Sequence, residues 1–275
     1  MKGIQVAAQL DSMEQALEAI LLLLDGDEPV TYKTDWFTLE GARLNLRPYT
    51  HPRFEVAVAS QVSPSGSRAA GRFGTSMLSI GATNQAGFDL LGYHWDIVEQ
   101  RAAEFGKPAD RHGWRLVGPM HLAETKEQAY KDVEFGLEKW IDYFQRVAAL
   151  PVAPDTSGAE EIADAVNASG FAVIGTPDDA IVQIERLWKQ SNGGFGTFLT
   201  MAQDWATVDA TRHSYELMAQ YVFPEFQGSS EAPTASRDWA AANRPTFMGE
   251  VGAAIMDQIA KHGAETGTAS GPTAG

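Results

Sequence analysis

The segment 60–67 is the part of the sequence whose residue types and spacing could do chemistry. It reads Ser-Gln-Val-Ser-Pro-Ser-Gly-Ser and lies between a β-rich run, Phe54–Ser60, and a predicted short helix over 68–73. Serine hydroxyls and main-chain N–H groups at a helix start donate hydrogen bonds toward one point, where the helix carries partial positive charge. Gly66 permits a close backbone approach or a positive φ. This pattern is typical of a phosphate-binding turn.

An ordinary polar turn with a helix N-cap has the same composition, since Ser, Pro and Gly are the commonest turn residues. From composition alone the ordinary turn is the favoured interpretation, because short Gly/Ser motifs often occur by chance. A second glycine-rich segment, Gly193–Gly196, precedes a predicted strand, whereas ligands collect at the carboxyl ends of strands. We therefore interpret Gly193–Gly196 as a tight turn.

The histidines and the search for familiar catalytic motifs indicate no metal site and no catalytic residue. The histidines at positions 51, 94, 112, 121, 213 and 262 include no pair at metal-ligand spacing. The sequence contains no HExxH zinc motif, P-loop, dinucleotide-binding glycine motif or nucleophile elbow. His121 lies at the C-terminal end of a predicted strand with Glu124 close by, but such a pair is more often a salt bridge or a cap. We therefore predict no metal site and name no catalytic residue.

The composition describes an acidic globular chain of 275 residues with a net charge of −15. Such a surface repels nucleic-acid phosphates and anionic lipid headgroups at long range, which disfavours general binding to either, although one small phosphate site remains compatible. Cysteine is absent, which excludes disulfides, thiolate metal sites and cysteine nucleophiles. With no long apolar run and no signal-peptide pattern, we expect a cytoplasmic protein.

The elements that would position the 60–67 segment alternate along the chain. Strands are predicted at 54–60, 77–80, 114–122 and 195–201, and helices at 12–24, 68–73, 95–105, 125–147, 159–168, 177–188 and 205–221. A hairpin-like stretch over 30–47 precedes the first of these strands. Strands that alternate with helices imply βαβ units and a parallel sheet, in an open doubly wound sheet or a closed barrel.

Stretches spread over most of the chain carry a resemblance. They are Thr34–Phe37, Leu46–Tyr49, Val58–Ser60, Ser63–Gly66, Trp114–His121, Ala123–Thr125 and Ile174–Pro177. Their types and order resemble the bacterial-luciferase-like flavin monooxygenases, and within that superfamily the limonene-monooxygenase-like group. The likeness extends from about residue 11 to about residue 227.

The resemblance implies a parallel (β/α)8 TIM-type barrel that binds reduced FMN at its C-terminal mouth. Reduced flavin and O2 would there oxygenate a small organic substrate, terpene-like by the subgroup likeness, and a separate flavin reductase would supply the reduced FMN. In such families the turn after the fifth strand holds the FMN phosphate. Carried over, Ser63 and Ser65 would donate hydroxyl or amide hydrogen bonds, and Gly66 and Ser67 would offer backbone N–H groups. This favours the phosphate-binding interpretation over the ordinary turn.

Only the second half of such a barrel is predicted, because the strong βα units begin at Phe54 and are four where a closed barrel needs eight. We expect an unplaced N-terminus at 1–10, the barrel region at 11–227, a helical extension at 228–262 and a disordered tail at 263–275. A half-barrel leaves open strand edges and an uncovered inner face. It should therefore be a poorly stable monomer that aggregates, forms a homo-oligomer or pairs with a missing N-terminal half.

Two alternative functions stay open. The chain could be a truncated, catalytically inactive flavin-binding or interaction module. It could also be a deazaflavin-dependent oxidoreductase of the same superfamily, because a phosphate cradle alone does not distinguish the two ring systems.

Overall fold

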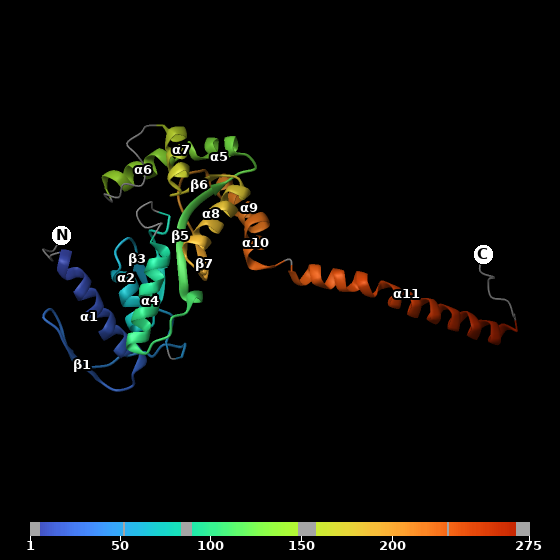
Figure 1. The fold of residues 1–275 in the computed structure, drawn as a ribbon, viewed down its shortest axis with the longest axis horizontal. Helices are drawn as coiled ribbons and strands as arrows, with labels where there is room; N and C mark the ends of the chain where they lie inside the picture. The colour runs from blue at the N-terminus through green and yellow to red at the C-terminus, as the bar shows by residue number, and fades with distance from the viewer. Residues whose placement is uncertain (1–5, 52, 84–89, 148–157, 230, 268–275) are drawn as a thin grey trace. The chain divides into compact units, whose positions relative to one another are not determined.

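The computed structural model describes residues 6–51, 53–83, 90–147, 158–229 and 231–267, with no side-chain description for 6–10 (Figure 1). The chain divides into two compact units, residues 1–218 and 219–275, and each is described by itself. None of the helices in the described ranges combines the length and the apolar character of a membrane span.

The first unit begins with helix α1, Val6–Asp25, followed by an antiparallel hairpin of β1, Val30–Lys33, and β2, Thr38–Ala42. The structure confirms the predicted helix and hairpin. It does not extend the strand pairing to residues 43–47, where Leu46 is 86% exposed. The alternation of apolar and polar residues there predicts a strand, but no strand among the described residues pairs with it.

A parallel sheet follows the hairpin, as the alternating pattern predicts. Its strands are β3, Ala57–Ser60; β4, Ser76–Ser79; β5, Trp114–Leu122; β6, Val173–Gly175; and β7, Thr197–Met201. Their order is β3-β4-β5-β6, and β7 pairs with the first part of β5 while β6 pairs with its last three residues. We did not predict β6, because three residues are too few to show a period. In the described sheet β3 pairs only with β4, and β7 only with β5, so both predicted open edges are present.

Helices cover one face of this sheet. After β3 and β4 come α2, Ser65–Phe73, and α4, Leu91–Phe105, which pack against each other (Figure 1). In β3 the side chains of Val58 and Ser60 are buried, whereas Ala57 and Ala59 are exposed. The register pairs Ala59 with Leu78 of β4, so these residues share the face turned away from the helices. We call the uncovered surface formed by Ala57, Ala59, Leu78, Thr197 and Leu199 the open face.

The helices after β5 gather at the end of the sheet where β5 ends (Figure 1). They are α5, Lys126–Val133; α6, Leu137–Arg146; and α7, Ala159–Ser169. Helix α8, Pro177–Gln190, follows β6 and packs against β5 and β6. The predicted single helix 125–147 is therefore wrong, because the chain breaks between α5 and α6. The reason is tertiary: Gly136 N donates to Trp205 O at 3.0 Å, and a Cβ on Gly136 would lie 2.0 Å from Asp204 O.

Helix α9, Val208–Leu217, closes the first unit and begins after Thr207, whose hydroxyl accepts from Ala210 N. The second unit contains α10, Phe223–Gln227, and the long helix α11, Glu231–Thr266, in which no residue is buried. Residues 263–266 are thus helical rather than part of the expected disordered tail, because α11 continues through Gly263 to Thr266. Residues 268–275 of that tail lie outside the described residues.

Candidate functional site

The turn between β3 and α2 lies at the carboxyl end of β3, where the sequence places it. Strand β3 ends at Ser60 and α2 begins at Ser65. The first backbone bond of the helix runs from Arg68 N to Pro64 O at 2.9 Å. The N–H groups of Ser65–Ser67 therefore have no acceptor within the helix. Donors at a helix start, together with the helix dipole, are a ready anion-binding arrangement.

The hydroxyls of Ser63 and Ser65 lie at the mouth of this turn. Their Oγ atoms are 2.7 Å apart, and the side chain of Ser63 is exposed. The N-cap residue of α2 is Pro64, so no side chain caps the helix start. No capping oxygen lies between the two hydroxyls and the main-chain donors, of which those of Gly66 and Ser67 belong to buried residues.

Gly66 and Ser67 contribute to the turn through their backbone. A Cβ on Gly66 would lie 2.5 Å from Ala59 O, so only glycine lets α2 start this close to β3. The Ser67 side chain is fully buried and donates to Met77 Sδ at 3.4 Å. Its hydroxyl therefore faces the core, which leaves only its backbone N–H as a donor at the helix start.

Ser60, the first residue of the segment 60–67, is a further polar residue beneath the turn, and its sequence position alone assigns it no role. Its side chain is 2% exposed, and its Oγ has no hydrogen-bond partner within the described chain. A buried hydroxyl without a partner is costly unless another group satisfies it. The donor set of this turn consists of hydroxyls and N–H groups without a carboxylate, which fits a phosphate group.

His94 of α4 holds the turn in place. Its ring is 1% exposed, and Nε2 lies 3.1 Å from Val62 O. Burial lowers the pKa of His94, while the bond to Val62 acts in the opposite direction. The neutral ring donates Nε2–H to the carbonyl and ties the turn to the neighbouring helix. The sequence predicts that His94, like the other histidines, is structural or exposed, but it does not indicate Val62 as the partner of its ring.

His121 is not brought to the turn. Ser60 is in register with Ser79, and Ser79 with Leu116, so His121 lies five residues beyond the level of Ser60. At about 3.3 Å per residue that is roughly 16 Å along the strand. The ring is 2% exposed, and its Nε2 lies 3.1 Å from Asp132 Oδ2 of α5. Burial lowers the pKa of His121, and Asp132 opposes this shift.

Glu124 does not pair with His121 but with His213 of α9, whose Nε2 is 2.7 Å from Glu124 Oε1. The hydrogen bond that His213 donates to Glu124 raises the pKa of His213. Nowhere in the described ranges do three histidine or carboxylate side chains converge to form a metal site. The two pairs join β5 and its following loop to α5 and α9.

The turn before β7 lies at Ser191 and Asn192, one step earlier than predicted, and Gly193–Gly196 form the bent connection from it to β7. Gly193 and Gly194 have φ values of 128° and 86°, which favour glycine. Arg111 Nη1 donates to Ser191 O at 3.0 Å and to Gly194 O at 2.8 Å, which fixes the turn. These carbonyls are therefore satisfied within the protein.

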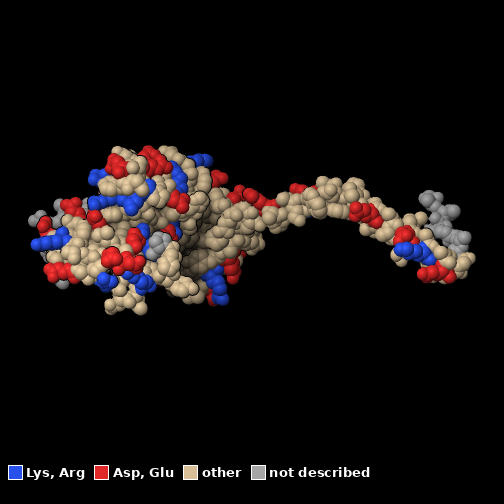
Figure 2. All heavy atoms as spheres, turned by 90° about the horizontal axis from the view of Figure 1, so that it is seen from below, with Lys and Arg blue, Asp and Glu red and all other residues tan. Residues whose placement is uncertain are grey.

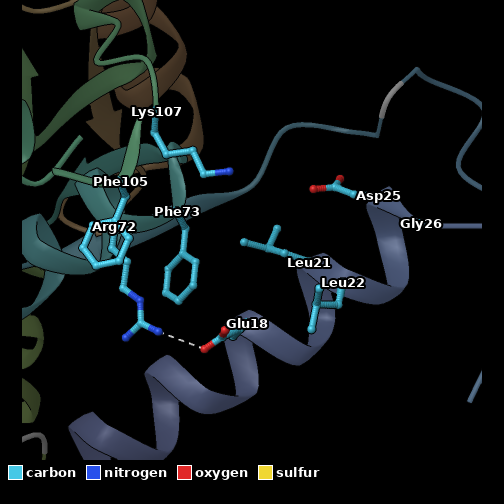
Figure 3. A pocket seen from close by; sticks show the side chains of 9 residues that line it. All are labelled: Glu18, Leu21, Leu22, Asp25, Gly26, Arg72, Phe73, Phe105 and Lys107. Atoms are coloured by element: carbon cyan, nitrogen blue, oxygen red, sulfur yellow. Dashed lines mark hydrogen bonds and ion pairs between the residues drawn. The ribbon is translucent and has the colours of Figure 1, made fainter. Parts of the chain in front are cut away.

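A cavity of about 400 Å³ lies at the opposite end of α2 from the serine turn (Figure 3). Its lining comprises Glu18, Leu21, Leu22, Asp25, Gly26, Arg72, Phe73, Phe105 and Lys107. Arg72 donates to Glu14 Oε2 at 3.0 Å and to Glu18 Oε2 at 2.9 Å. The cavity thus marks the junction of α1 with α2 and α4 and is separate from the candidate phosphate site.

Comparisons with known proteins agree with this architecture. A sequence profile described as luciferase-like monooxygenase matches residues 1–193. Limonene 1,2-monooxygenase of Rhodococcus erythropolis is 45% identical over 229 residues, which are 83% of this chain and 57% of the relative. The 4-hydroxyprotoasukamycin monooxygenase of Streptomyces nodosus subsp. asukaensis is 36% identical over 242 residues, 87% of this chain and 65% of the relative. The chain thus spans less than two thirds of the length of these curated relatives.

Solved structures show the same fold at low identity. A monooxygenase from Streptomyces bottropensis has a TM-score of 0.63 and 18% identity, over 81% of this chain and 63% of its own. The oxygenating constituent of 3,6-diketocamphane monooxygenase of Pseudomonas putida was solved with FMN. It has a TM-score of 0.58 and 22% identity, over 81% of this chain and 66% of its own. The sheet described above is therefore part of a TIM-type barrel. By its fold, and by the profile that covers most of its length, the chain belongs to the luciferase-like monooxygenase family.

Proposed function

We propose that this chain forms the phosphate-binding part of an FMN-dependent monooxygenase, in which reduced FMN and O2 oxygenate a small organic substrate. The observation that carries the proposal is the start of α2, where the N–H groups of Ser65–Ser67 and the hydroxyls of Ser63 and Ser65 meet without a capping side chain. Bound flavin would supply the oxygen chemistry. The residues of this chain would hold and orient the phosphate end of the cofactor.

The choice of FMN over a deazaflavin is part of the proposal. One similar structure holds FMN, and another, an F420-dependent secondary alcohol dehydrogenase, holds an F420-acetone adduct. Both curated relatives are named monooxygenases, which supports oxygen chemistry. We therefore place FMN first and keep the deazaflavin as an outcome of the test.

The names of the similar proteins support proposals for the substrate and the partners of this chain. The relative of higher identity is named for limonene, which supports a small terpene-like substrate. The Pseudomonas protein is named an oxygenating constituent, which fits reduced flavin arriving from a separate reductase. The open face is an uncovered sheet surface, so we propose that a second copy or four further βα units cover it in the active assembly.

The test measures flavin binding and oxygen use together. The chain is supplied with FMN, NADH, a flavin reductase and limonene, and incorporation of ¹⁸O from ¹⁸O2 into the terpene is followed. Limonene-dependent incorporation supports the monooxygenase. Bound FMN without any oxygenated product supports the inactive flavin-binding module instead. Tighter binding of coenzyme F420 than of FMN supports the deazaflavin-dependent oxidoreductase.

A further inference from the structure

Arg68 is the basic residue that stands beside the serine turn. It is the only lysine or arginine in the sequence from 61 to 71, and its side chain is exposed. In the described part of the chain its guanidinium has no hydrogen-bond or ion-pair partner. By contrast, Arg72, one helical turn later, is held between Glu14 and Glu18. The guanidinium of Arg68 is therefore free to bind a ligand.

Helix geometry directs the Arg68 side chain toward the turn. Pro64 and Ser65 precede it by four and three residues, which places all three on one face of α2. Cα–Cβ bonds in a helix tilt toward the N-terminus, so a long side chain covers the turn before its own Cα. Helix geometry thus directs the Arg68 side chain to the same end of α2 as Ser65.

A cation at this place would strengthen the binding of a dianion. The chain has a net charge of −15, which opposes the approach of an anion. Figure 2 shows acidic and basic side chains intermixed over the visible face, without a broad basic patch. The donors of the turn are neutral, and His94 behind it is a buried histidine whose pKa is lowered. The first turn of α2 contains no acidic residue that would neutralise Arg68.

We propose that Arg68 closes the phosphate site and selects phosphorylated flavin over the unphosphorylated form. Its guanidinium pairs with the phosphomonoester dianion that the helix start and the serine hydroxyls hold from the other side. This inference rests on the proposed function, because it assigns a further residue to the same site.

The experiment compares the affinities of FMN and riboflavin by fluorescence titration of the full chain. Arg68→Gln is expected to weaken FMN binding about 10-fold or more. Its affinity for riboflavin should stay within about twofold of the wild-type value. Arg68→Lys keeps the charge but not the paired N–H donors. Its FMN affinity should lie between those of the wild type and Arg68→Gln. The control is Lys107→Gln, which removes one positive charge at the opposite end of α2 and should change neither affinity.

The outcomes separate the inference from the proposed function. An FMN-to-riboflavin affinity ratio that is the same in the wild type and in Arg68→Gln overturns the role of Arg68. The phosphate site itself still stands in that case if Ser63→Ala/Ser65→Ala lowers FMN affinity. A wild-type chain that binds FMN no more tightly than riboflavin overturns both. Circular dichroism verifies the fold of each variant, and Arg68→Met, which keeps the apolar stem, repeats the test if the glutamine variant unfolds.

Discussion

Ser60 and Gly66 meet at the junction of β3 and α2, where a Cβ on Gly66 would lie 2.9 Å from Ser60 Cβ. Real Cβ atoms do not approach this closely, so the glycine is what allows the helix to start directly over the strand end. This contact places the free N–H groups of α2 above the carboxyl end of β3. The geometry of the candidate phosphate site therefore depends on the packing of two backbone segments.

Gly66→Ala is expected to destabilise the protein by about 1–3 kcal/mol, because the added methyl group overpacks against Ala59 O and Ser60. Urea unfolding followed by circular dichroism measures the change. The matched control is Gly249→Ala in α11, where a Cβ meets nothing within 4 Å. That variant should be neutral or slightly stabilised by the better helix propensity of alanine. Equal stability of Gly66→Ala and the wild type would contradict the close-packing argument.

Ser63→Ala/Ser65→Ala should weaken FMN binding by about 1–3 kcal/mol, the scale for losing hydrogen bonds to a charged group. Fluorescence titration with FMN gives the affinity. Ser67→Ala is the control, because its buried hydroxyl faces Met77 and not the turn. It should leave FMN affinity unchanged. If the double variant binds FMN as the wild type does, the assignment of the two hydroxyls is wrong.

Arg72 and Glu18 join α2 to α1 through a contact of 2.9 Å, with side chains 29% and 35% exposed. Because both groups are partly solvated, a double-mutant cycle with Arg72→Gln and Glu18→Gln should give a coupling of about 0.2–1 kcal/mol. The coupling should shrink in about 1 M salt, where screening acts over about 3 Å. Urea unfolding of the wild type, the two single variants and the double variant gives the free energies of unfolding. A coupling that salt does not change would argue against a solvated pair.

The buried His121 predicts a loss of stability at acidic pH. Its folded pKa lies below the usual 6.5, so under mildly acidic conditions the unfolded chain binds a proton that the folded chain does not. The free energy of unfolding should therefore fall as pH decreases through about 6.5 toward the folded pKa. His94 acts in the same direction. His213 acts oppositely, since its pKa is raised, but it lies at the surface and contributes little.

Urea unfolding at about pH 7.5 and about pH 5.5 tests this dependence. In His121→Gln the amide can still donate to Asp132, while the titrating ring is gone. The variant should lose less stability on acidification than the wild type. An identical pH dependence in the two proteins would show that His121 does not contribute.

The open face predicts association of the chain in solution. Leu199 of β7 is 37% exposed, and Leu78 is only partly buried on the same face. Leu78→Lys/Leu199→Lys should therefore reduce the concentration-dependent mass that light scattering measures, because like charges on this surface oppose its burial. A wild-type chain that is a monodisperse monomer with one sharp unfolding transition would contradict this prediction.

Local patterns in the sequence determine much of the fold. The bounds of β5 agree with the predicted strand 114–122, because its apolar run is long and bounded by turn residues. The start of α8 is also local: Thr176 accepts from Asp179 N, and the Asp179 side chain accepts in return. The serine turn can also be predicted from the sequence, because the turn and the strand and helix on either side of it lie within one short segment.

Contacts between distant segments decided the rest. The break at Gly136 depends on Asp204 and Trp205, and the partners of His121 and Glu124 come from α5 and α9. The position of His121 beyond the level of the turn follows from strand register, which periodicity along one strand does not contain. The sequence therefore determined the family and the donors of the candidate site. Only tertiary packing decided which polar groups remain free there, because a hydrogen bond between distant residues depends on where the whole sheet places them.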